Sequence, residues 1–127
     1  MSYKLNYLDD KKIIRVKIQG RLSFSLAQQY STEALKLARE NNCSKFLFDH
    51  TRTLLEAGVY KLHTDGDTLE QFGFKSNDDI AVVISVDHSP AHILNAKKSN
   101  IKWSNIQYFN SVNEAIIWLL QVHISRK

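Results

Sequence analysis

Two short, unbroken apolar runs constrain the fold of this chain most strongly. Residues 46–48 read FLF, and residues 80–84 read IAVVI. A strand with one wet face alternates apolar and polar residues, whereas a strand covered on both faces can be apolar throughout. The two runs therefore predict central strands of a parallel sheet that is covered on both sides.

The first 20 residues show the alternation of half-buried strands instead. Tyr3, Leu5 and Tyr7 alternate with polar residues. After a polar turn at residues 9–12, the apolar residues of 14–18 alternate in the same way. Two such strands joined by a short turn form an antiparallel hairpin, which we expect to end at Gly20.

Apolar residues at helical spacing predict four helices. The first begins at a capping box formed by Ser25 and Gln28 and ends at residues 41–42. The others cover residues 59–72, 90–101 and 111–120, and a last strand at 106–109 precedes the final helix. The predicted order is β-β-α-β-α-β-α-β-α, an α/β domain over residues 1–127 with a mixed sheet and right-handed crossovers.

Length and composition narrow the classes of protein to be considered. A chain of 127 residues suits one domain with one core. It has no stretch near the roughly 20 uncharged apolar residues of a membrane span, and its start lacks the apolar region of a signal peptide. Cys43 is the only cysteine, which fits a reducing compartment. We therefore expect a soluble, cytoplasmic protein.

The basic residues do not form a recognisable nucleic-acid motif. The net charge is +4, and the excess is scattered along the chain. Nucleic-acid-binding proteins usually combine a basic patch with interspersed aromatic residues or a known binding motif, and the sequence shows neither. We therefore do not expect nucleic acid to be the partner.

Three segments carry a resemblance to a known family. Residues 45–49 (KFLFD) resemble the third strand of the STAS domain, which ends in aspartate, and residues 80–83 (IAVV) resemble its fourth strand. Residues 108–111 (YFNS) and 114–119 (EAIIWL) look like the closing strand and helix of the stand-alone SpoIIAA-like branch. The resemblance covers nearly the whole chain. It implies the fold shared by anti-sigma-factor antagonists and sulfate-transporter tails, which is related to that of the lipid-carrying CRAL-TRIO domains.

The resemblance also implies a function. It indicates a regulatory or protein-interaction module rather than an enzyme, with a protein partner contacting residues 51–60 and Lys61. In antagonists that switch by phosphorylation, a serine opens the helix after the third strand. The corresponding residues here, 56–60 (EAGVY), have no hydroxyl at that position. We therefore expect no phosphoacceptor at that position.

Two Asp-His pairs follow the apolar runs, at Asp49-His50 and at Asp87-His88. We expect both at the carboxyl edge of the sheet, where ligands bind in open α/β folds. With Arg52 nearby, they could form a metal, proton-relay or anion site. In the alternative, the aspartates cap loops and helices while the histidines are partly exposed. Neighbouring strand residues point to opposite faces, so the sequence leaves convergence open.

The candidate residues share positions at strand ends or on the second helix. For ligand or partner binding they are Asp49, His50, Thr51, Arg52, Tyr60, Lys61, Asp87 and His88. We assign no catalytic residue, metal or cofactor, because the chain lacks a G-x-S-x-G context and a glycine-rich phosphate loop.

Three further possibilities stay open at this stage. The alternative function is binding of a small apolar or amphipathic ligand between helices and sheet, and an enzyme using the Asp-His pairs ranks third. The aromatic residues near element ends line a pocket, form a homodimer contact or close the core; they are Phe24, Phe72, Phe74 and Trp103.

Overall fold

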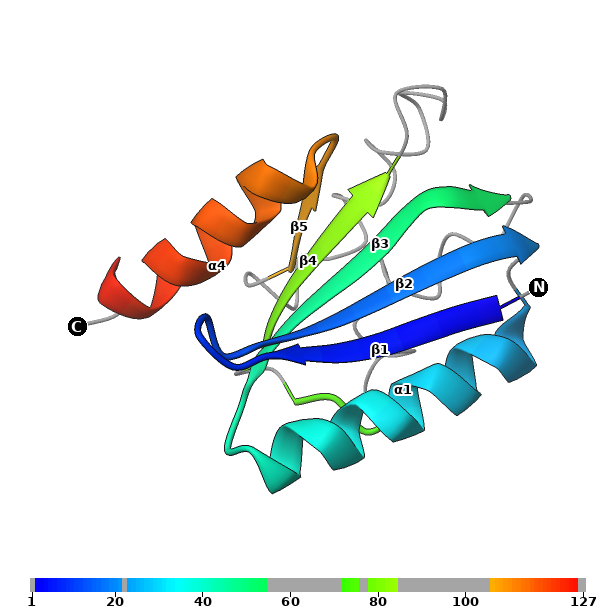
Figure 1. Cartoon of the computed structure of the whole chain (residues 1–127), viewed down its shortest axis with the longest axis horizontal. Helices are drawn as coiled ribbons and strands as arrows, with labels where there is room; N and C mark the ends of the chain where they lie inside the picture. The colour runs from blue at the N-terminus through cyan, green and yellow to red at the C-terminus, as the bar shows by residue number, and fades with distance from the viewer. Residues whose placement is uncertain (1, 22, 55–71, 76–77, 85–105, 126–127) are drawn as a thin grey trace.

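In the computed structural model, five strands form one mixed sheet in the order β1-β2-β3-β4-β5 (Figure 1). The structure describes residues 2–21, 23–54, 72–75, 78–84 and 106–125. Within these ranges the α/β class and the mixed sheet agree with the prediction. The helices predicted over 59–72 and 90–101 fall almost entirely outside the described residues.

The N-terminal hairpin is confirmed. Strands β1 (Ser2–Leu8) and β2 (Ile13–Arg21) pair antiparallel, with Tyr3 opposite Ile18 and Lys4 opposite Lys17. Because side chains alternate along a strand, Tyr3 and Ile18 share one face of the sheet while the two lysines share the other. β2 continues one residue past Gly20.

The parallel part of the sheet is confirmed as well, with one difference in length. Strands β3 (Lys45–Leu54), β4 (Asp79–Ile84) and β5 (Ile106–Phe109) run parallel to one another, and β3 runs parallel to β2. All six residues of β4 are buried, as its apolar run predicts. The prediction that the third strand ends at Asp49-His50 is wrong, since β3 continues to Leu54.

The N-cap of helix α1 (Phe24–Glu40) lies two residues earlier than predicted. Ser23 is the N-cap: its backbone is extended (φ −126°, ψ 160°) and its Oγ accepts a hydrogen bond from Leu26 N at 3.1 Å. The capping box of Ser25 and Gln28 is therefore wrong, because Ser25 already lies in the first helical turn. The left-handed stop after the helix is confirmed by Asn42, whose φ is +51°.

Helix α4 (Val112–Ser125) starts as the sequence predicts. The Ser111 Oγ accepts a hydrogen bond from Glu114 N at 3.4 Å, which is one half of the expected capping box. Ala115 and Leu119 are buried against the sheet, whereas Leu120 is 39% exposed.

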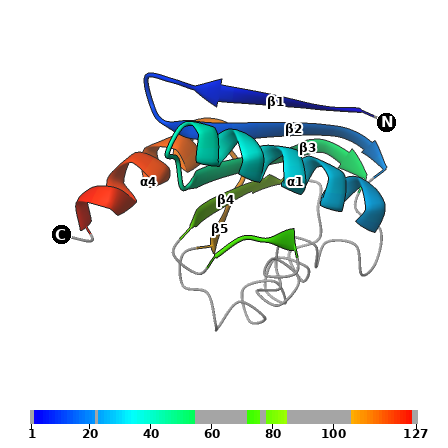
Figure 2. The ribbon, with the colours of Figure 1, turned by 90° about the horizontal axis from the view of Figure 1, so that it is seen from below.

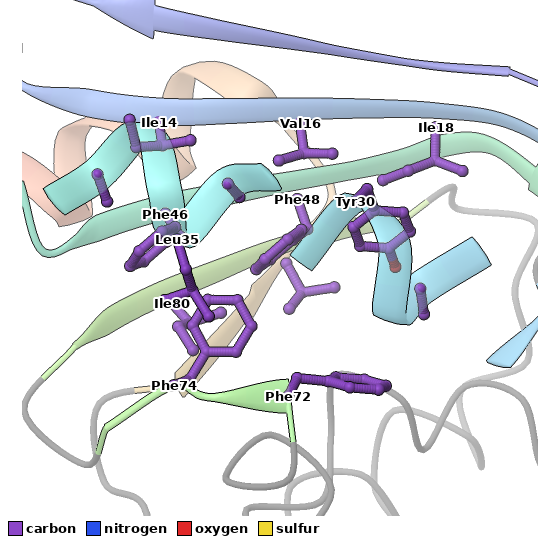
Figure 3. Close-up of a cluster of buried hydrophobic side chains, with 14 of the residues drawn as sticks. Ile14, Val16, Ile18, Tyr30, Leu35, Phe46, Phe48, Phe72, Phe74 and Ile80 are labelled. Atoms are coloured by element: carbon purple, nitrogen blue, oxygen red, sulfur yellow. The ribbon is translucent and has the colours of Figure 1, made fainter. Parts of the chain in front are cut away.

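The two helices cover opposite faces at opposite ends of the sheet (Figures 1 and 2). α1 packs on β1 and β2, whereas α4 packs mainly on β4. The α1 side holds a cluster of aromatic rings: Tyr30 lies 5.9 Å from Phe48, and Phe74 meets Phe46 edge-on at 5.0 Å between ring centroids (Figure 3). Burying each such ring stabilises the fold by about 1.5–3 kcal/mol.

Apart from Leu8 and Ile13 near the turn, which pack in the cluster that contains Ala115 and Leu119 of α4, the face of β1 and β2 that points away from α1 is not covered by either described helix. In Figure 1 both strands lie in full view with no helix drawn over them. The side chains of Lys4, Asn6 and Gln19 on this face are exposed, and those of Arg15 and Lys17 are half-buried. This open face positions the candidate site.

Candidate functional site

The candidate site is built around a bulge in β3. Asp49 lies opposite Lys17, whereas Arg52 lies opposite Gln19, so β3 advances three residues while β2 advances two. His50 and Thr51 therefore face a single β2 residue. A β-bulge of this kind bends the strand and changes the direction of its side chains. Residues 49–52, which the sequence placed at and after the end of the strand, therefore remain part of β3.

Asp49 holds the bulge together. It is 3% exposed, and its Oδ1 accepts hydrogen bonds from Thr51 N at 3.0 Å and from the Thr51 hydroxyl at 2.7 Å. Its Oδ2 lies 3.5 Å from Nη2 of Arg15 on β2. Charge-assisted hydrogen bonds are among the stronger ones in proteins, so this carboxylate fixes the backbone of the extra residue. The prediction that Asp49 caps a local turn is close to what is found.

His50 lies on the other face of the sheet. Its side chain is 1% exposed, and its Nδ1 lies 3.1 Å from the Thr53 hydroxyl, which donates to Ile18 O at 2.9 Å. A hydroxyl has one hydrogen to give, so the Nδ1 of His50 must donate to Thr53. The prediction of a partly exposed histidine is wrong for His50. β3 continues past this residue, so its side chain is buried on the side of the sheet that α1 covers.

The first Asp-His pair therefore does not act as one site, since Asp49 and His50 point to opposite faces. Tyr60, Lys61, Asp87 and His88 lie outside the described residues. Whether Asp87-His88 approaches the first pair, and whether residues 60 and 61 join the site, thus stays a prediction.

Of the four predicted site residues that the structure describes, Thr51 and Arg52 reach the surface. Both are exposed, and Arg52 lies beside Gln19 on the open side of the sheet. On the same side lie Lys17 and, across the hairpin, Lys4. We define the basic sheet face by the residues that share this surface, which are Lys4, Arg15, Lys17, Gln19 and Arg52.

The positive charges of the basic sheet face are incompletely neutralised. Among the described residues, Arg15 is paired with Asp49, whereas Lys4, Lys17 and Arg52 have no acidic partner. The Nε of Arg15 is buried and finds no hydrogen-bond acceptor within the described part of the chain. Part of the face is hollowed, and the hollow of about 350 Å³ is lined by Tyr3 together with Lys4, Lys17 and Gln19.

Sequence reasoning missed this face although the signal was present. The alternation of the hairpin already places Lys4, Lys17 and Gln19 on one side. It does not show that the described helices leave these residues uncovered, nor that the end of β3 adds Arg52 to them. Both depend on the position of the helices and on the bulge.

The opposite side of the sheet is a packed core. Tyr30 is fully buried, and burial raises the pKa of its phenol well above the ordinary value, so the ring stays neutral. The Tyr3 hydroxyl donates to the Glu33 carboxylate of α1, and this hydrogen bond raises the pKa of Tyr3. Phe72 and Phe74, expected near element ends, close this core. These contacts tie β1, α1 and the centre of the sheet together.

Two further observations bear on the kind of site. In the described ranges, no three histidine, cysteine or acidic side chains gather as metal ligands would. None of the described helices has the length and apolar character needed to cross a bilayer.

No protein-family model matches the sequence, and no curated protein matches it either.

Proposed function

We propose that this chain is a non-enzymatic regulatory module of the STAS type that binds a protein partner. The observation that carries the proposal is the exposure of Thr51 and Arg52 at the end of β3, continuous with the basic sheet face. These two residues begin the segment that the resemblance implies as the contact surface. The proposed contact surface therefore consists of residues 51–60 together with the basic sheet face, on which Lys4 and Lys17 have no acidic partner among the described residues.

The fold supports this proposal at a coarse level. An antiparallel hairpin that leads through a helix into parallel strands is compatible with the order of a STAS domain. The fold alone does not determine function, so the argument depends on the surface rather than on the architecture.

The arrangement of the polar residues favours binding over catalysis. General acid-base catalysis needs groups that converge on one reacting atom. Asp49 and His50 are separated by the sheet, and each is engaged in hydrogen bonds that hold β3. The side chains left to meet another molecule are the exposed ones, Thr51 and Arg52. The alternative function, binding of an apolar ligand, stays a prediction because no described observation favours it.

Affinity capture with surface variants tests the proposal. We expect the wild-type chain to retain a reproducible protein partner from a lysate of its source cells. Arg52→Glu and Tyr60→Glu should each lose that protein, because they place a negative charge in the contact surface. Lys36→Glu is the matched control, since Lys36 is exposed on α1, away from the basic sheet face.

Circular dichroism melts must show that all variants are folded. Capture that is unchanged by Arg52→Glu and Tyr60→Glu, or a wild-type chain that retains no protein, would contradict the proposal. Native mass spectrometry of the purified chain examines the alternative function, which predicts an added mass that disappears on denaturation.

A further inference from the structure

We propose that the basic sheet face is the docking site for an acidic, extended segment of a partner protein. This inference rests on the proposed function and adds the chemistry of the partner. It starts from Lys4 and Lys17, which are directly opposite each other on neighbouring antiparallel strands.

The cross-strand lysine pair is unfavourable unless an anion joins it. Directly opposed residues have Cβ atoms about 4.5–5.5 Å apart, and like charges in such pairs are destabilising. Among the described residues no acidic side chain forms an ion pair with Lys4 or Lys17, and Asp49, which lies opposite Lys17 on β3, is paired with Arg15 instead. A carboxylate seated in the hollow between them would relieve this repulsion and contact both ammonium groups.

Protection of an edge strand against unwanted pairing would explain Lys4 but not Lys17. Charged residues, lysine above all, commonly guard edge strands against unwanted pairing. β1 is an edge strand, so this accounts for Lys4. Lys17 lies on β2, which is flanked by β1 and β3 and has no edge to guard. The charge on β2 therefore favours a binding role.

The spacing of the cations fits an extended peptide. Lys17 and Gln19 are alternate residues of β2, and Arg52 lies beside Gln19 on β3. Strand geometry places the backbone positions of Lys17 and Arg52 about 8 Å apart. An extended peptide places alternate side chains on one side about 6.8 Å apart, and flexible lysine and arginine side chains bridge the difference. Acidic residues at every second position can thus meet both cations.

The same surface is less suited to nucleic acid. Proteins that bind single strands on a sheet stack the bases on aromatic side chains. The described residues of this face include no aromatic side chain, and the phenol of Tyr3 is directed to Glu33 on the other side of the sheet. The face therefore offers charge without a stacking platform, which favours carboxylates.

Fluorescence anisotropy with defined probes tests the inference on the full chain. The probe is a labelled short peptide of alternating glutamate and threonine, with a glutamine-threonine peptide and an oligothymidine of equal length for comparison. We expect the glutamate peptide to bind near physiological ionic strength and the glutamine peptide not to bind. K4Q/K17Q should weaken binding of the glutamate peptide about tenfold, the effect of losing two partly exposed ion pairs.

The matched control is K12Q/K36Q, which removes the same charge at two exposed lysines outside the basic sheet face. It should change the affinity less than about twofold, as expected for distant charges that salt screens. Equal weakening by both double variants, absence of binding by the glutamate peptide, or tighter binding of oligothymidine would each overturn the inference. The last result would identify a phosphate-binding surface.

The outcome is separable from that of the proposed function. If the wild-type chain captures a protein that Arg52→Glu loses and K4Q/K17Q still retains, the interaction module stands and the acidic segment does not. If no protein is captured but the peptide series behaves as expected, the basic sheet face stands and the proposed function fails.

Discussion

Replacing Asp49 should destabilise the fold even though the sequence marks this residue as a candidate binding group. In Asp49→Ala, the amide and hydroxyl of Thr51 lose their acceptor, and Arg15 loses its carboxylate partner. The side chain is almost completely buried, so water does not easily replace these contacts. The expected result is a clear loss of folding free energy.

The magnitude follows from the contacts. A hydrogen bond to a charged group contributes about 1.5–3 kcal/mol, and the ion pair with the partly exposed Arg15 about 0–1 kcal/mol. Because the two bonds to Thr51 share one oxygen and removal of a buried charge also relieves its desolvation, we expect a total loss of about 2–4 kcal/mol rather than the full sum. Asp49→Asn keeps an acceptor oxygen and should lose only about 1 kcal/mol.

Urea denaturation at neutral pH, followed by circular dichroism, measures both losses. The difference between the alanine and asparagine variants is the decisive quantity, because it isolates the acceptor from the charge. A loss below about 1 kcal/mol for Asp49→Ala, or equal losses for the two variants, would refute the bulge-holding role. Asp49 would then be retained for a reason other than stability.

Two other predictions concern the cap of α1 and the pH dependence of stability. Ser23→Ala should lower the folding free energy by about 1 kcal/mol, whereas Ser25→Ala should change it by less than about 0.5 kcal/mol, as measured by urea denaturation. Equal losses of folding free energy in the two variants would contradict the assignment of Ser23 as the N-cap. Burial raises the pKa of Asp78, so the native state holds this proton more tightly than the unfolded chain does. Its contribution to stability therefore falls as pH rises from the unfolded pKa through the raised folded pKa. Asp78→Asn keeps an acceptor for the Lys75 amide. As pH rises through this window, its folding free energy should increase relative to that of the wild type. Parallel curves of folding free energy against pH would contradict the prediction.

Much of the candidate site could not have been located without the tertiary structure. The sequence offered Thr51 and Arg52 as binding candidates, and the structure shows that both are exposed, while their role in binding stays a prediction. It could not show that β3 continues through them, since Asp49 is a residue type typical of turns and the residues after it no longer form an apolar run. The burial of Asp49 and His50 and their contacts depend on Arg15, Ile18 and Thr53, which are distant in sequence or on the other face.

The sequence by itself determined the α/β class, the hairpin, the buried strand β4 and the faces of α1. Each of these depends on local periodicity, because side chains alternate along strands and recur every 3.6 residues along helices. Only the tertiary structure decided the strand order, the length of β3 and the opposite placement of α1 and α4. Those features depend on pairing between distant segments. That is why Lys4, Lys17 and Arg52, scattered along the chain, come together on one face, in a part of it that neither described helix covers.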